Sequence, residues 1–314
     1  MIPRHESDVR PPITRLYTHA MTPAATDTWT TRRLLDWIAG AFTERGLDSP
    51  RLSAEILVAH VVGCDRLRLY MDPDRPAAPA ERETLRDLVK RALAHEPIQH
   101  LTGEGWFFGL PFHCDARALI PRPSTETVVE HVLQHARRSD AAPLRRVLDV
   151  CTGTGCIAIA LAKNLPDAAL VATDLSDDAL ALAAQNAERH AVSDRVAFRS
   201  GDLLEPVAGE DAFDAIVSNP PYIPDHEWAD VPPNVKDHEP HLALRGGPDG
   251  LDIVRRLIAD APARLAPSGW LVIEVAAAHA RDAAALATDA GFTDVTILQD
   301  HEGLDRVVAA HKPA

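Results

Sequence analysis

The 314-residue chain has few cysteines and no long apolar run, and each shortage excludes a class of protein. Its four cysteines are scattered without a Cys-x-x-Cys pair, which favours free thiols over a disulfide framework. No window has the apolar length of a membrane-spanning helix, and the N-terminus lacks the apolar stretch of a signal peptide. These absences predict a cytoplasmic protein that does not enter the membrane.

Positive charge is also scarce, because 32 Lys and Arg residues stand against 46 Asp and Glu residues, for a formal net charge of −14. Binding to a nucleic-acid backbone requires clustered Lys and Arg, so we expect no non-specific binding of nucleic acid. Hydrophobic residues still make up 46% of the chain, and aromatic residues only 5%. This composition predicts a globular protein whose core is built mainly of Leu, Val, Ile and Ala.

The sequence predicts four segments. Residues 1–28 lack helical or strand periodicity and predict a disordered tail, so that Met21 offers an alternative start. Helical periodicity over residues 29–100 predicts a small helical domain. Short aromatic runs split by Gly and Pro predict a β-hairpin linker over residues 101–118. Residues 119–314 then form the second domain.

Strands and helices alternate through most of this second domain, which predicts an α/β fold with a mainly parallel sheet covered on both faces. The connection over residues 299–306 is too short for a parallel crossover, so the last strand is expected to be antiparallel. Helices are expected at Ser176–His190 and Leu251–Leu265. Strands are expected at Val147–Cys151, Leu170–Asp174, Val196–Arg199, Phe213–Ser218, Trp270–Val275, Val295–Leu298 and Val307–Ala310.

A glycine-rich turn follows the first of these strands and precedes a helix; its sequence is Cys151-Thr152-Gly153-Thr154-Gly155. The two glycines allow a sharp turn and let a ligand approach the N–H groups at the helix start. Asp174 ends the next strand, 21 residues after Gly153, where a carboxylate can accept hydrogen bonds from both hydroxyls of a ribose. Taken alone, the pattern also fits a dinucleotide-binding fingerprint.

Three further features favour S-adenosyl-L-methionine over a dinucleotide. Asp149 lies just ahead of the turn, where a carboxylate would repel a pyrophosphate but suits the cationic amino-acid end of S-adenosylmethionine. Asp202 and Leu203 follow the third strand, and the Asp202 carboxylate can accept from the amino group of adenine. The third feature is the tetrapeptide after the fourth strand. The alternative is that Asp149 and Asp202 only cap helices.

This tetrapeptide, Asn219-Pro220-Pro221-Tyr222, lies at the carboxyl edge of the sheet, where open α/β folds bind ligands. The nitrogen of a glutamine amide or an adenine amino group is a poor nucleophile because its lone pair is delocalised. The Asn219 side-chain oxygen and the Pro220 carbonyl can accept its two N–H groups and aim the lone pair at a methyl carbon. The prolines stiffen the loop, and Tyr222 offers a flat face to the planar group. The nitrogen becomes acidic only as it gains the methyl group, so no strong base is required. The alternative is a Pro-Pro turn without a catalytic role.

Together, the two motifs resemble those of S-adenosylmethionine-dependent methyltransferases that act on exocyclic or amide nitrogens. The surrounding chain resembles the HemK/PrmC family of protein-(glutamine-N5) methyltransferases, peptide chain release factor enzymes, in the segments 105–112, 119–126, 238–252 and 303–308. The resemblance implies a Rossmann-like methyltransferase domain of seven strands behind a helical domain and a hairpin. It also implies methylation of the glutamine in the Gly-Gly-Gln loop of release factors, with S-adenosyl-L-homocysteine as the product.

The resemblance further implies which residues bind. Asn219, Pro220, Pro221 and Tyr222 would bind the glutamine. The cofactor would be held by Asp149, Cys151, Thr152, Gly153, Thr154, Gly155, Asp174, Asp202, Leu203 and Asn219. Arg122 and Glu126 would lie beside the pocket.

The chain departs from the family pattern at two positions. Cys151 stands where release factor enzymes usually have glycine, as in sister enzymes that act on a large-subunit ribosomal protein, and Ser124 replaces an acidic residue. The helical domain resembles that of the release factor enzymes, so a release factor is the expected protein partner. The protein is expected to be a monomer. A ribosomal protein, or less favourably a DNA or RNA amino group on a flipped base, is the alternative substrate.

A histidine pair and an acidic stretch do not indicate a further site. His131 and His135 have the spacing of a metal pair, but no third ligand is evident, so no metal is expected. The acidic stretch over residues 225–239 fits a flap over the substrate and a solvated loop equally well.

Overall fold

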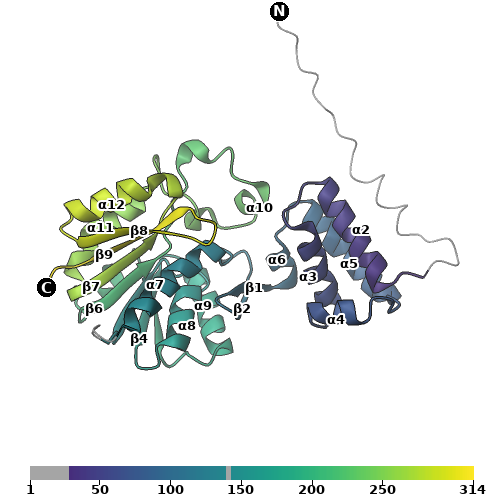
Figure 1. Cartoon of the computed structure of the whole chain (residues 1–314), viewed down its shortest axis with the longest axis horizontal. Coiled ribbons are helices and arrows are strands. Elements are labelled where there is room, and N and C mark those ends of the chain that lie inside the picture. Colours follow the sequence, from purple (N-terminus) through teal and green to yellow (C-terminus); the bar gives the residue numbers. More distant parts are fainter. Residues whose placement is uncertain (1–27, 139–142) are drawn as a thin grey trace, which may run out of the picture. The chain divides into compact units, whose positions relative to one another are not determined.

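The computed structural model describes residues 28–138 and 143–314 (Figure 1). These residues form two compact units that divide between Ala94 and His95. Apart from Thr28, the predicted disordered tail lies outside the described residues, as does Met21. The division into segments at residues 28, 100 and 118 stays a prediction, since a compact unit begins at His95 rather than at any of these positions.

The first unit is helical, as predicted. Thr30 caps its first helix by accepting a hydrogen bond from the Arg33 N–H at 3.4 Å, and a proline opens the second helix in the position that lacks an N–H partner anyway. Its fully buried core residues include Leu34, Ile38, Phe42, Leu57 and Leu85. The helices are α2 (Thr31–Glu44), α3 (Pro50–Val62), α4 (Arg66–Met71) and α5 (Pro79–Leu93).

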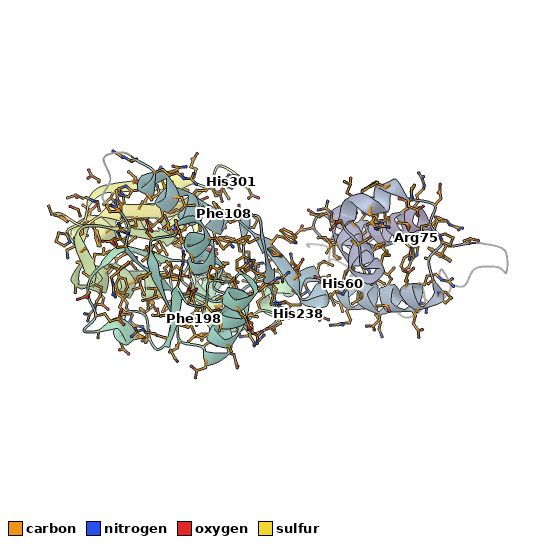
Figure 2. The ribbon with its side chains drawn as sticks, turned by 90° about the horizontal axis from the view of Figure 1, so that it is seen from below. His60, Arg75, Phe108, Phe198, His238 and His301 are labelled. Carbon is orange, nitrogen blue, oxygen red and sulfur yellow. The ribbon has the colours of Figure 1, made fainter. Side chains whose placement is uncertain are left out.

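The second unit begins with a short helix, α6 (Ile98–Thr102), and an antiparallel hairpin of β1 (Glu104–Phe107) and β2 (Leu110–His113). Phe108, which Figure 2 labels, and Gly109 form its two-residue turn with φ of 51° and 73°, the left-handed values that match the twist of a hairpin. The Phe108 N–H donates to Glu126 Oε1 at 2.7 Å, which ties the turn to the following helix. The predicted β-hairpin is therefore present.

A seven-stranded sheet in the order β5-β4-β3-β6-β7-β9-β8 forms the centre of this unit. Strands β3 to β7 pair in parallel, and β9 runs antiparallel to both of its neighbours, β7 and β8. This arrangement confirms the predicted α/β fold with its antiparallel last strand. The strands are β3 (Arg146–Val150), β4 (Ala169–Asp174), β5 (Val196–Ser200), β6 (Phe213–Ser218), β7 (Leu265–Glu274), β8 (Thr293–Gln299) and β9 (Asp305–His311).

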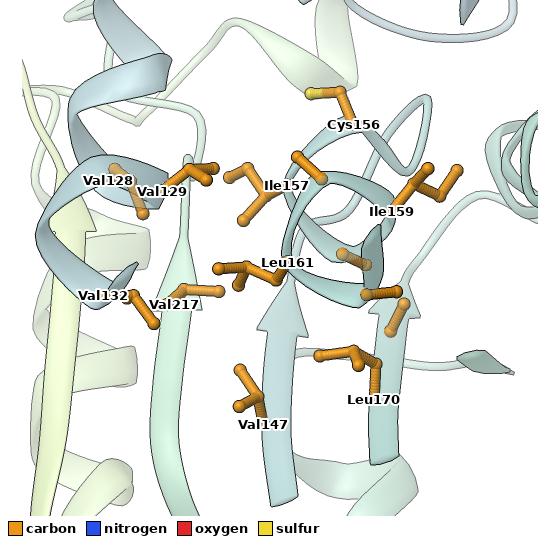
Figure 3. Packing of buried hydrophobic residues seen from close by; sticks show 14 of the residues in the cluster. Val128, Val129, Val132, Val147, Cys156, Ile157, Ile159, Leu161, Leu170 and Val217 are labelled. Carbon is orange, nitrogen blue, oxygen red and sulfur yellow. The ribbon is translucent and has the colours of Figure 1, made fainter. Parts of the chain in front are cut away.

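Helices pack on both faces of the sheet, because successive strand residues point to opposite faces. Val147 packs with helices α7 and α8, as Figure 3 shows, whereas the adjacent Leu148 belongs to the core with α11 and α12. Burying each such side chain contributes roughly 1.5–3 kcal/mol. The helices are α7 (Glu126–Ala136), α8 (Cys156–Asn164), α9 (Asp177–Arg189), α10 (Pro233–Lys236), α11 (Asp252–Asp260) and α12 (Ala280–Asp289).

One predicted helix is too long. The apolar periodicity after Leu251 predicts a helix to Leu265, but α11 ends at Asp260 and a 3-10 turn follows over Ala261–Ala263. Leu265 instead begins β7, because it pairs with Phe213 at the start of β6. The carboxyl ends of β3, β4, β6 and β7 then meet at one edge of the sheet, where the predicted site residues lie.

Candidate active site

Two cavities open at this edge of the sheet. The first, which we call the cofactor cavity, lies against the glycine-rich turn and the ends of β4 and β5. The second, the acceptor cavity, lies against the residues after β6. Four residues line both cavities: Leu119, Arg122, Asn219 and Ala243. Of the predicted site residues, those that line the cofactor cavity are Cys151, Thr152, Gly153, Thr154, Asp174, Asp202, Leu203, Asn219 and Pro221.

The glycine-rich turn is left-handed at three positions, with φ of 60° at Cys151, 55° at Gly153 and 80° at Gly155. A Cβ at Gly155 would lie 3.1 Å from side-chain atoms of both Ala183 and Ile159, so this glycine lets α8 pack closely. Among the described residues, a Cβ at Gly153 would come within 4 Å only of the Ala118 side chain, at 3.9 Å. Gly155 is therefore required by packing, whereas Gly153 leaves open space on the side of the cavity.

Asp149 is fully buried behind this turn and lies outside the described lining of the cavity. Its Oδ2 accepts hydrogen bonds from Thr152 Oγ1 at 2.6 Å and from the Ala158 N–H at 3.1 Å, which hold the turn against the start of α8. Its Oδ1 has no hydrogen-bond partner among the described residues. Burial raises the pKa of the Asp149 carboxyl to about 7, although its two hydrogen bonds oppose the shift. A nearby cation would stabilise its ionised form.

Asp174 ends β4 beside the same turn. Its Oδ2 accepts the Gly153 N–H at 2.8 Å, and its Oδ1 accepts the Ser176 N–H at 2.9 Å. Burial raises the pKa of this carboxyl above its usual range. The carboxylate is thereby fixed at the wall of the cofactor cavity.

The loop after β5 also lines the cofactor cavity. Leu203 is buried with φ of 49°, and its carbonyl accepts the Thr173 hydroxyl at 3.0 Å. Asp202 Oδ2 accepts from Arg256 Nη2 at 2.6 Å, a contact across the surface that the sequence does not reveal. Arg256 comes from α11 and orients the Asp202 carboxylate.

Asn219 lies where the two cavities meet, and Tyr222 lines the acceptor cavity. Pro220 is buried, and Pro221 faces the cofactor cavity. The acceptor cavity also contains the acidic side chains of Glu227 and Asp230 from the 225–239 stretch. The tetrapeptide therefore separates a space for one ligand from a space for another.

A buried carboxylate stands behind the tetrapeptide. Glu274, at the end of β7, is fully buried, and its Oε2 accepts the Thr125 hydroxyl at 2.5 Å. Its Oε1 accepts the Ser124 hydroxyl at 3.1 Å and the Tyr222 hydroxyl at 3.2 Å. Asn219 Nδ2 donates to Thr125 Oγ1 at 2.9 Å. Burial raises the pKa of the Glu274 carboxyl, while these hydroxyls oppose the shift.

Sequence reasoning misses Glu274. Its only signal is a lone acidic residue at the end of the apolar run Leu271–Ile273. Its partners Ser124 and Thr125 lie about 150 residues earlier in the chain and Tyr222 lies 52 residues earlier, so local periodicity carries no trace of them.

Arg122 and Glu126 have different surroundings. Arg122 lines both cavities and pairs with Glu239, whose other oxygen accepts the Ile120 N–H at 2.9 Å. Glu239 is buried, so it anchors the end of the 225–239 stretch to the loop before α7. Glu126 lies outside the described lining of both cavities and instead holds the hairpin turn through Phe108.

The two histidines on α7 pack around an indole. The ring centroids of His131 and His135 lie 5.6 Å and 4.8 Å from that of Trp270. Over residues 28–138 and 143–314, no group of three or more His, Cys, Asp or Glu residues is arranged to hold a metal ion. Nor does that part of the chain contain a helix long and apolar enough to cross a membrane.

Comparison with known proteins places the chain among named relatives. Two family models match it, the PrmC N-terminal domain over residues 33–103 and the methyltransferase small domain over residues 124–233. The chain is 43% identical to a protein of Geobacter sulfurreducens named release factor glutamine methyltransferase, over 89% of this chain and 96% of that protein. Proteins of the same name from Chlorobaculum tepidum and Rhodopirellula baltica are 42% and 38% identical, over 88% and 93% of this chain and 96% and 100% of theirs.

Proposed function

The chain belongs to the release factor glutamine methyltransferase family, and on this premise we propose that it methylates a release factor glutamine. The methyl group moves from S-adenosyl-L-methionine to the side-chain amide nitrogen, N5, of the glutamine in the Gly-Gly-Gln loop. Family membership confirms the resemblance drawn from the sequence. The observation that carries the proposal is the place of Asn219, at the junction of a cofactor cavity and an acceptor cavity.

The residues around the first cavity fit S-adenosylmethionine. Asp149, behind the glycine-rich turn, has a buried carboxylate oxygen with no hydrogen-bond partner among the described residues, which suits the cationic amino-acid end of the molecule. Gly153 leaves room for close approach to the turn. Asp174 and Asp202 stand at the cavity wall, where their carboxylates can accept from the ribose hydroxyls and the adenine amine. Cys151, Thr152, Thr154 and Leu203 also line this cavity.

S-adenosylmethionine supplies a methyl group on a positively charged sulfur, and S-adenosyl-L-homocysteine is the product. Asn219 Oδ1 and the Pro220 carbonyl accept the two N–H groups of the glutamine amide, which turns the lone pair of its nitrogen towards the cofactor cavity. Tyr222, held by its hydrogen bond to Glu274, forms a flat wall for the amide. The nitrogen loses its proton only after it has gained the methyl group, so the site needs acceptors rather than a strong base.

The names of the relatives favour a release factor over the two alternatives, a ribosomal protein and a nucleic-acid amino group. We propose a peptide chain release factor as the protein partner, a monomeric enzyme, and the cytoplasm as its compartment.

Labelling tests the proposal. The protein is incubated with methyl-labelled S-adenosylmethionine and with purified release factor, large ribosomal subunits or DNA in separate reactions. Label is expected in the release factor, and it should disappear when the loop glutamine of the release factor is replaced by alanine. Label only in a ribosomal protein or in DNA would overturn the proposal.

A variant tests the positioning role of the tetrapeptide. Asn219→Ala is expected to lose roughly 100-fold or more in turnover, because an amide that is no longer held in line reacts slowly. Equilibrium binding of S-adenosylmethionine should remain measurable in this variant. Turnover close to that of the unmodified protein would contradict the role.

A further inference from the structure

We infer that Glu274 is a positioning residue, which acts through Thr125 to present the Asn219 side-chain oxygen, rather than its nitrogen, to the acceptor. The inference rests on the proposed function, because it concerns the same amide. It starts from the chain of contacts Glu274–Thr125–Asn219, of which Glu274 is fully buried and Thr125 nearly so.

The direction of this chain follows from counting protons. An ionised carboxylate can only accept, so the single hydroxyl proton of Thr125 points to Glu274 at 2.5 Å. Thr125 Oγ1 then has only lone pairs for Asn219, and the atom that faces it at 2.9 Å must be a donor. That atom is Nδ2, which leaves Asn219 Oδ1 as the acceptor on the other branch of the amide.

Reversal of the hydrogen bonds from Glu274 through Thr125 to Asn219 would disable the site. If position 274 donated to Thr125, the Thr125 proton would turn to Asn219, and the Asn219 amide would rotate to accept it. Its NH2 group would then face the NH2 group of the glutamine, and two donors cannot bond to each other. The charge state of Glu274 therefore decides whether Asn219 can hold the acceptor.

Three hydroxyls stabilise the accepting state. Ser124 and Tyr222 donate to Glu274 Oε1 while Thr125 donates to Oε2, and each hydroxyl has only one proton to give. Arg306, the charged group nearby on β9, also favours the ionised carboxylate. Burial opposes this and raises the pKa of the Glu274 carboxyl.

Threonine variants test the link. Thr125→Val removes the hydroxyl at nearly constant volume, and kcat at saturating substrates is expected to fall roughly 10- to 100-fold, because the Asn219 amide loses its orientation. Thr125 also lines the cofactor cavity, so the Kd for S-adenosylmethionine is measured separately and is expected to change much less than kcat. Thr125→Ser restores the hydroxyl and is expected to recover most of the turnover.

Thr127→Val is the matched control, because the Thr127 hydroxyl is also buried but has no hydrogen-bond partner among the described residues. Its kcat should equal that of the unmodified protein. If Thr125→Val and Thr127→Val turn over at the same rate, the inference is wrong.

A pH profile tests the role of the charge. The kcat of the unmodified protein should fall as the pH is lowered through the raised pKa of Glu274, because the protonated carboxyl can donate to Thr125. Glu274→Gln, which can donate at every pH, is expected to be slow and to lack this acidic limb. Asp149 and Asp174 also have raised pKa values but are the same in both proteins, so the limb that disappears belongs to Glu274. An unchanged limb in Glu274→Gln would refute the inference.

A measurement without turnover separates this inference from the proposed function. In the NMR spectrum, the side-chain NH2 of Asn219, assigned with Asn219→Ala, should exchange slowly with solvent in the unmodified protein and faster in Thr125→Val. Equal exchange in both proteins would overturn the inference. Absence of methyl transfer to release factor, together with this difference in exchange, would overturn the proposed function and leave the positioning role supported.

Discussion

Replacement of Gly155 by alanine should destabilise the second unit through two separate effects. Gly155 has φ of 80°, and placing a residue with a Cβ in the left-handed region costs roughly 1–2 kcal/mol. The new Cβ would also lie 3.1 Å from Ala183 Cβ and from Ile159 Cδ1, a crowding that costs roughly 1–3 kcal/mol. The sum predicts a loss of roughly 2–5 kcal/mol in the free energy of unfolding.

A second glycine isolates the crowding. Gly291 follows α12 in the same unit with φ of 89°, and a Cβ there would meet no atom of the described residues within 4 Å. Gly291→Ala should therefore lose only the backbone contribution, about 1–2 kcal/mol. The difference between the two variants, roughly 1–3 kcal/mol, measures how tightly the turn packs on α9.

Urea unfolding followed by circular dichroism measures both variants, and calorimetric titration with S-adenosylmethionine follows the turn itself. Gly155→Ala is expected to bind the cofactor more weakly than Gly291→Ala, because a shifted turn displaces the N–H groups at the start of α8. Equal losses of stability in the two variants would show that Ala183 and Ile159 yield without strain, and would refute the packing argument.

Three further predictions concern the same edge of the sheet. Burial raises the pKa of the Asp149 carboxyl from 3.8 to about 7. Between these pH values the folded state therefore binds more protons than the unfolded state. The free energy of unfolding is thus expected to fall as the pH rises from about 4 to about 7. Asp149→Asn should remove this pH-dependent loss of stability, which is roughly 4 kcal/mol at most. The free energy of unfolding of both proteins is measured across this pH range. A difference between the two proteins that does not change with pH would contradict the prediction. Cys151→Gly should keep its free energy of unfolding within about 1 kcal/mol and should still bind the cofactor, because glycine adopts φ of 60° without strain. Thermal melting measures the stability, and titration with S-adenosylmethionine measures the binding. Loss of binding would contradict the prediction. Glu239→Gln keeps an acceptor for the Ile120 N–H but loses the ion pair with Arg122. The free energy of unfolding should fall by roughly 1–3 kcal/mol, and the KM for the release factor should rise. An unchanged KM would exclude an anchoring role for Glu239.

The strands could be predicted because each is a local apolar run that ends in a turn. All seven expected strands are present, and the Phe213–Ser218 run matches β6 at both ends. The end of α11 could not be predicted, since the apolar pattern continues to Leu265 while pairing with Phe213 assigns that residue to β7. Tertiary pairing overrides periodicity at such a boundary.

The candidate site divides in the same way. Asn219 and the glycine-rich turn are evident from the sequence because short motifs carry their chemistry. Glu274, Glu239 and Arg256 are not, because each acts on a segment 50 or more residues away through a single side chain. Nothing local to these residues distinguishes them from other acidic or basic side chains at the end of a strand, in a loop or on a helix.

Two residues other than glycine have left-handed backbone conformations at this edge of the sheet, and they show why the sequence alone underestimates its rigidity. Cys151 and Leu203 have φ of 60° and 49°, which their side chains disfavour in isolation. Neighbouring bonds impose both conformations, since the Thr152 N–H next to Cys151 donates to the Thr173 carbonyl at 3.0 Å and the Thr173 hydroxyl donates to the Leu203 carbonyl. Thr173, in β4, thus holds both the glycine-rich turn and the loop after β5, and both segments line the cofactor cavity. A wall held in a strained conformation is set before the ligand arrives, and so the ligand need not supply the ordering free energy.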